Sequence, residues 1–131
     1  MTFSKPLKVM RTLLYSFGNI SFFNRGVRYM SLISTMQDLE RALYKKNINM
    51  KEFIEKLGQM LEKARLLVMM ANDQQSYNDI IELVSFYASD GDSELAESVR
   101  SFINTYLALS KGLSEEDYKC FKKLVLFYLQ A

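Results

Sequence analysis

The side chains of this chain that can do acid–base or covalent chemistry are few. The sequence holds no histidine, so the commonest general base and metal ligand is missing. Its single cysteine, Cys120, has Lys119 and Lys122 close by, and neighbouring lysines favour a thiolate. Because no base is available to activate it, we expect Cys120 to be a small buried hydrophobic residue. The residue types therefore predict no enzyme, no catalytic residue and no cofactor.

Metal and phosphate sites are also not expected. One cysteine without histidine cannot supply the ligands of a structural zinc site. The stretch DGDSE, Asp90 to Glu94, is too short for a calcium loop and has its glycine in the wrong place. The five glycines stand far apart, so no glycine-rich phosphate loop can form. We interpret residues 90–94 as a helix-capping turn.

The strongest sign of binding chemistry lies in the N-terminal part of the chain. Residues 1–37 contain five bases and no acid, and several aromatic residues lie among the bases. Aromatic side chains stack on nucleic-acid bases, while Arg and Lys hold phosphates. Residues 8–29 are therefore a candidate nucleic-acid interface. Its candidate contacts are Lys8, Arg11, Phe22, Phe23, Arg25 and Arg28.

Two other interpretations of this segment stay open. An acid-free, Arg-containing start is typical of cleavable organelle presequences. Alternatively, Phe22 and Phe23 pack as core or at a protein interface with the bases in solvent, which is the usual fate of aromatics in a small domain. We favour the structural interpretation. Gly18 and Gly26 predict a loop between them, and residues 1–26 form a basic, aromatic and partly flexible segment.

Charge is distributed unevenly along the chain. Residues 71–117 carry ten acids against two bases, a net charge of −8, whereas residues 38–70 carry +2 and residues 118–131 carry +3. Such asymmetry indicates either an electrostatic partner or two parts of the chain that attract each other. We favour mutual attraction.

Length and composition favour one helical domain over residues 1–131. A chain of this length builds one core, and five glycines with one proline favour long helices over a β-sandwich. We predict a single compact all-α bundle of five to six mostly antiparallel helices. The helices on either side of the turn at residues 45–49 should form a hairpin.

Helix boundaries follow from capping residues and glycines. We predict an N-terminal helix, then a helix capped by Asn24, then a helix over Met50–Ala71 in which Asn49 and Glu52 form a capping box. Ser76 and Asp79 should open a fourth helix, with Leu83 and Tyr87 in its apolar stripe. Gly112 should end the fifth helix, and Ser114 should cap the last one.

The last helix is apolar on every side from Leu124 to Leu129. A helix of this kind is either central or covered by a partner. The candidate protein interface is Leu124, Leu126, Phe127 and Tyr128. The eight methionines are interpreted as core filler rather than as an adaptable binding groove.

From these patterns we expect a small non-enzymatic helical protein-interaction module, or an accessory subunit of a larger complex, that binds a protein partner or itself. One alternative is an RNA- or DNA-binding accessory subunit of a ribonucleoprotein that uses residues 8–29. Another is an organelle-targeted helical protein with a cleavable N-terminus. No apolar run approaches the roughly 18 residues that span a bilayer, and one cysteine forms no internal disulfide. We expect an intracellular, cytoplasmic protein.

Overall fold

A computed structural model describes residues 22–130 of the chain, with side chains over residues 30–129. Its five helices are α2 (Phe22–Lys45), α3 (Met50–Met69), α4 (Gln74–Ala88), α5 (Ser93–Ser110) and α6 (Glu115–Gln130). The described residues contain no strand. The prediction of a compact all-α bundle is confirmed.

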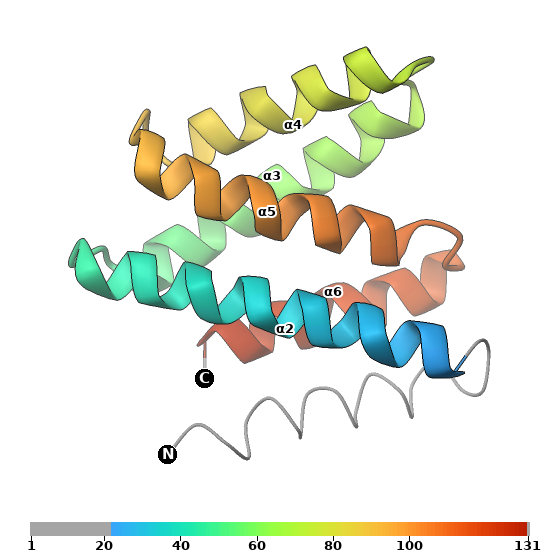
Figure 1. The fold of residues 1–131 in the computed structure, drawn as a ribbon, viewed down its shortest axis with the longest axis horizontal. Coiled ribbons are helices and arrows are strands. Elements are labelled where there is room, and N and C mark those ends of the chain that lie inside the picture. Colours follow the sequence, from blue (N-terminus) through green and yellow to red (C-terminus); the bar gives the residue numbers. More distant parts are fainter. Residues whose placement is uncertain (1–21, 131) are drawn as a thin grey trace.

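The helices pack in two layers (Figure 1). In this view α2, α5 and α4 lie one above another, and α3 and α6 pass behind them. α5 packs antiparallel along α2 and also against α4, while α3 packs against both α4 and α6. The predicted hairpin of α2 and α3 is wrong, because α2 packs mainly on α5. A short turn keeps the ends of two helices close, but it does not force their lengths together.

Several helix ends lie where capping chemistry predicts them. The Asn49 side-chain oxygen accepts a hydrogen bond from the Glu52 N–H at 3.2 Å, and the Ser114 hydroxyl accepts from the Asp117 N–H at 3.1 Å. Gly112, just past α5, has a φ of +84°, which a residue with a Cβ adopts only under strain. The capping roles of Asn49, Ser114 and Gly112 are confirmed.

The predicted N-cap of α4 is wrong. Asp73, not Ser76 with Asp79, caps the helix, and its carboxylate accepts a hydrogen bond from the Ser76 N–H at 2.7 Å. This hydrogen bond lowers the pKa of the Asp73 carboxyl. Either Asp73 or Ser76 is a good N-cap by residue type, and the cap chosen lengthens the helix by three residues.

The start of α2 also differs from the prediction. The helix begins at Phe22 and runs through Gly26, so the loop predicted between Gly18 and Gly26 is wrong over residues 22–26, and Asn24 is not the cap. A glycine costs a helix about 1 kcal/mol relative to alanine. The long apolar stripe farther along α2 offsets that cost by packing into the core.

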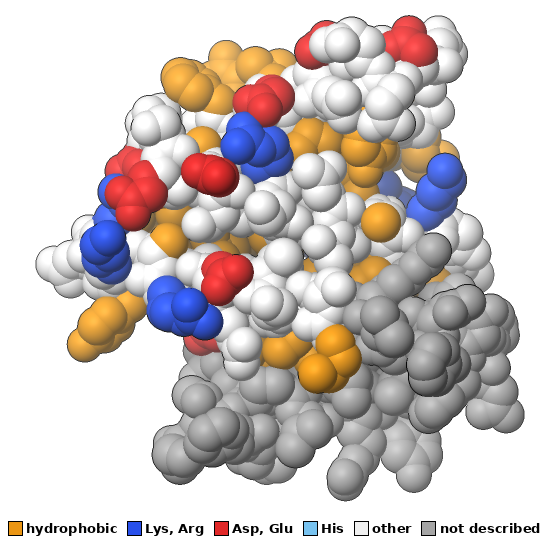
Figure 2. Space-filling view, in the orientation of Figure 1, with side chains coloured by type: hydrophobic (Ala, Val, Ile, Leu, Met, Phe, Trp, Pro, Cys, Tyr) orange, Lys and Arg blue, Asp and Glu red, His pale blue; other side chains and the backbone are white. Residues whose placement is uncertain are grey.

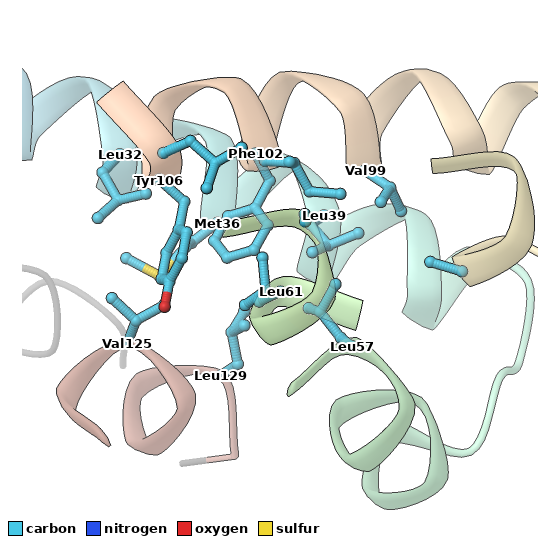
Figure 3. Close-up of a cluster of buried hydrophobic side chains, with 14 of the residues drawn as sticks. Leu32, Met36, Leu39, Leu57, Leu61, Val99, Phe102, Tyr106, Val125 and Leu129 are labelled. Carbon is cyan, nitrogen blue, oxygen red and sulfur yellow. The ribbon is translucent and has the colours of Figure 1, made fainter. Parts of the chain in front are cut away.

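The core is one continuous cluster to which all five helices contribute. Figure 3 shows side chains from four of them meeting at its centre. The labelled residues are Leu32, Met36 and Leu39 of α2, Leu57 and Leu61 of α3, Val99, Phe102 and Tyr106 of α5, and Val125 and Leu129 of α6. α4 adds Ile81 and Val84 to the cluster.

The turn between α4 and α5 is tied to the basic residues of α2 and α3. Asp90 and Gly91 adopt φ values of +52° and +78°, as expected of a tight capping turn. Four ion pairs hold it: Lys45–Glu94 at 3.5 Å, Lys46–Asp92 at 2.9 Å, Lys46–Glu94 at 3.5 Å and Lys56–Asp90 at 2.5 Å. Part of the negative charge of residues 71–117 is therefore paired with bases of residues 38–70, as the interpretation of mutual attraction expects.

Candidate protein-interaction site

The structure tests little of the candidate nucleic-acid interface. Lys8 and Arg11 lie outside the described residues. Phe22, Phe23, Arg25 and Arg28 lie in the first two turns of α2, and their side chains are outside the described part. The assignment of residues 8–29 to nucleic acid stays a prediction.

The structure separates the four predicted interface residues of α6. Tyr128 is buried in the core, Leu124 and Leu126 are half-buried, and Phe127 is 66% exposed. Leu126 packs against Gly58 of α3, where an added Cβ would lie 3.4 Å from the leucine Cδ1. Tyr128 thus belongs to the fold rather than to a surface, because a period of 3.6 residues per turn points it inward while Phe127 points outward.

The outward face of α6 is basic around Phe127. Lys119, Cys120, Lys123 and Phe127 are all exposed, and their spacing places them on one side of the helix. The expectation that Cys120 is buried is wrong, because the core-facing side of α6 is occupied by larger apolar residues. The candidate interface of α6 reduces to Phe127 with two neighbouring lysines.

Arg65 of α3 binds two residues of α6, Glu115 and Tyr118. Its guanidinium donates two hydrogen bonds to the Glu115 carboxylate, at 3.4 and 3.0 Å, and its central carbon lies 3.8 Å from the centre of the Tyr118 ring. The hydrogen bonds to Arg65 lower the pKa of the Glu115 carboxyl and raise the pKa of Arg65. These groups fasten α6 to α3.

Two tyrosines complete this inner cluster. The Tyr106 hydroxyl donates a hydrogen bond to the Tyr118 hydroxyl at 2.9 Å, and both rings are buried. Burial raises the pKa of each phenol, so both stay neutral at ordinary pH. Neither is an available proton donor or acceptor for a ligand.

A pocket of about 620 Å³ lies where α3 ends and α4 begins, beside the loop from α5 to α6. Its walls mix apolar with polar and charged side chains, and its guanidinium, Arg65, is already bound to Glu115. Its lining residues are Arg65, Val68, Met69, Ala71, Asn72, Asp73, Gln74, Tyr77, Leu107, Ala108, Ser110, Lys111, Gly112 and Leu113.

Methionines border this pocket. Met69, in its wall, and the neighbouring Met70 are 71% and 76% exposed. The interpretation of the methionines as core filler holds for Met36, which is buried, and is wrong for these two. They lie in the last turn of α3 and just beyond it, where no described helix covers them.

The larger apolar surface lies on the outer side of α4, which we call the α4 face. Leu83, Phe86 and Tyr87 are each more than half exposed, at 54%, 56% and 56%. Figure 2 shows apolar side chains gathered over the C-terminal half of this helix. The rings of Phe86 and Tyr87 meet edge to face at 6.0 Å, and Phe86 also lies against Gly91. The exposed rings of this face therefore contact each other and the turn that follows α4.

The α4 face was not found from the sequence, which placed Leu83 and Tyr87 in the packing stripe. The side that packs carries small residues, Ser85, Ala88 and Ser89, all buried. The Ser85 hydroxyl donates to the Ile81 carbonyl at 2.7 Å, and the Ser89 hydroxyl donates to the Ser85 carbonyl at 2.7 Å. With their hydroxyls satisfied, these small side chains let neighbouring helices approach α4 closely.

The edge of the α4 face is acidic. α4 contains no Lys or Arg, and helical spacing aligns Asp79 with Leu83 and Phe86, while Asp90 lies in the turn that follows the helix. Asp90 is paired with Lys56. Asp79 accepts a hydrogen bond from the Gln75 amide at 2.9 Å and has no ion pair among the described residues. The surface thus combines an apolar centre with an available carboxylate.

Within residues 22–130 the structure offers no other kind of site. No cluster of three metal-binding side chains occurs among these residues. None of the described helices combines the length and apolar character needed to cross a bilayer.

No protein-family model matches the chain, and no solved structure matches it. A stretch of 76 residues, 56% of the chain, is 33% identical to the phenylalanine–tRNA ligase beta subunit of Methanosphaera stadtmanae. The matched stretch spans only 14% of that protein.

Proposed function

We propose that this protein is a small non-enzymatic interaction subunit that binds a protein partner through the α4 face. The supporting observation is the exposure of Leu83, Phe86 and Tyr87 side by side on a helix at the edge of the bundle. Contiguous exposed apolar surface with a polar rim is typical of protein interfaces, and aromatic residues are enriched at their centres.

The described polar groups support binding rather than catalysis. Three carboxyl groups have a lowered pKa, those of Asp73, Asp92 and Glu115. Asp73 and Asp92 are helix caps, and Glu115 is held by Arg65. Their shifted pKa values follow from structural hydrogen bonds, so they do not indicate an active site.

We do not propose ligase activity from the similarity to a tRNA ligase subunit, because the matched stretch covers a small part of that subunit. RNA binding by residues 8–29 is the alternative that the following experiment can reveal. The intracellular location expected from composition is part of the same proposal.

The test is to recover the full chain, carrying an affinity tag, from the cells that normally produce it. Three versions are compared: wild type, the double variant Leu83→Gln/Phe86→Gln, and the control Tyr44→Gln. Tyr44 is a large exposed aromatic residue on a different helix, α2. We expect a defined set of proteins to accompany wild type and the control and to be lost from the double variant.

Equal recovery of those proteins by the double variant would contradict the proposal. Recovery of RNA without protein, reduced when Arg25 and Arg28 are replaced by Gln, would favour the nucleic-acid alternative instead.

A further inference from the structure

Two outward faces of this chain are opposite in charge and alike in layout. The α4 face has Leu83 and Phe86 with the carboxylate of Asp79 beside them. The outward face of α6 has Phe127 with Lys123 beside it. The charge nearest each apolar centre has one sign, a carboxylate on α4 and an ammonium on α6, and these two signs are complementary. The α6 face also carries Glu116, which lies about three turns from Phe127, beyond Lys123 and Lys119.

The spacing on the two helices also corresponds. Asp79 precedes Leu83 by four residues, and Lys123 precedes Phe127 by four residues. Four residues of α-helix rise about 6 Å, so charge and apolar centre are separated equally on both faces. When the two helices lie side by side in the same direction, Phe127 meets Leu83 and Phe86 while Lys123 meets Asp79.

The carboxylate and the ammonium groups are available for this contact. The other bases of the region are already used, because Lys56 is bound to Asp90 and Lys122 is bound to Glu62 at 2.7 Å. Among the described residues, Lys119 and Lys123 are in no ion pair, and neither is Asp79. A charged group that is in no ion pair within its own chain has no such pair to break when it binds a charge on another copy.

One copy cannot join its own two faces. α4 and α6 pack on α3 and are not neighbours of each other, and they lie at different sides of the bundle. We propose that the α4 face binds the outward face of α6 from a second copy of the same chain. The contact joins two different surfaces, so it is heterologous and propagates head to tail unless a ring closes.

This inference rests on the proposed function, since it names the occupant of the same α4 face. The test uses two full-length variants that each lack one face: Leu83→Gln/Phe86→Gln and Lys123→Gln/Phe127→Gln. Molar mass is measured by light scattering against protein concentration, and circular dichroism checks that each variant keeps its helices.

For the wild type we expect a mass that rises with concentration beyond a dimer and falls as salt is added, since salt screens the Asp79–Lys123 contact. Each variant alone should remain a monomer, with self-association weakened roughly tenfold or more. An equimolar mixture should form a dimer and nothing larger, because one intact face of each type remains. The control Tyr44→Gln should behave as wild type.

An exchange of charges keeps the test decisive if replacing the apolar residues by Gln unfolds the chain. Asp79 and Lys123 are both exposed, and Asp79→Lys or Lys123→Asp alone should weaken self-association. A chain carrying both should regain part of it, because the two charges are exchanged across the contact.

Several results would overturn the inference. A wild type that is monomeric at every concentration would do so, as would variants that associate as well as wild type. A variant that still dimerises on its own would show a contact between like faces, and a mixture that stays monomeric while wild type associates would show that the α4 face does not bind the α6 face. A monomeric wild type whose cellular protein partners are still lost in Leu83→Gln/Phe86→Gln would remove the second copy as occupant and leave the proposed function intact.

Discussion

Two pairs of aromatic rings in this molecule have nearly the same geometry and opposite surroundings. Tyr106 and Tyr118 meet edge to face at 6.3 Å with an interplanar angle of 77°, and Phe86 and Tyr87 meet at 6.0 Å with an angle of 79°. The first pair is buried, whereas each ring of the second pair is more than half exposed. Edge-to-face geometry therefore does not distinguish a core pair from a surface pair, and burial depends on whether other helices cover the two rings.

The inner pair is covered from several sides. Phe121 of α6 packs 5.1 Å from the Tyr106 ring, and Arg65 of α3 lies over Tyr118. The hydroxyls bond to each other, so burial leaves the Tyr106 donor satisfied. α4, at the edge of the bundle, has helices on its inner side, and its outer pair remains open. We therefore expect the buried pair, Tyr106 and Tyr118, to contribute to the stability of the fold, and the exposed pair, Phe86 and Tyr87, to contribute to binding.

The largest effect is expected at the inner cluster. Phe121→Ala removes a ring with no solvent exposure and leaves a cavity between α5 and α6. We expect a loss of about 3–5 kcal/mol in the free energy of unfolding, measured by urea denaturation. A loss below about 1 kcal/mol would show that α6 repacks freely and that the inner cluster is not the centre of stability.

A smaller effect is expected from acid. The Leu95 N–H and then Lys46 hydrogen-bond to the Asp92 carboxylate and hold its pKa below the ordinary value. A lowered pKa means that the unfolded chain binds more protons, so the stabilisation is complete above about pH 4 and is lost as the pH falls through the folded pKa. The same sign applies to Asp73 and Glu115.

We therefore expect the free energy of unfolding to fall as the pH is lowered from about 5 toward 2. Asp92→Asn keeps an oxygen that can cap α5 but loses the charge, so its unfolding free energy should depend less steeply on pH. Parallel pH profiles for wild type and Asp92→Asn would contradict this assignment.

The sequence predicted the fold class and several helix ends because these depend on local chemistry. Asn49, Ser114 and Gly112 each act within a few residues of their own position. The partner of α2 was wrong, because its apolar stripe does not say which other helix it meets. Pairing of helices is a property of the whole bundle.

The candidate site was hidden for a related reason. Apolar residues surround α4 on most sides, from Tyr77 to Tyr87, so periodicity alone does not say which side faces the core. The deciding signal was the small residues Ser85, Ala88 and Ser89, which mark the side of close packing. On α6 the same ambiguity made Tyr128 and Phe127 equal candidates, although Tyr128 is buried and Phe127 is exposed.

The smallest effect is expected on the α4 face, and its measurement tests the division between stability and binding most directly. The quantity is the free energy of unfolding of Leu83→Gln/Phe86→Gln, compared with wild type at a concentration where both are monomeric. Because both side chains are largely exposed and Gln is a good helix former, we expect a change of no more than about 1 kcal/mol. A loss above about 2 kcal/mol would show that Leu83 and Phe86 belong to the core and would contradict the account.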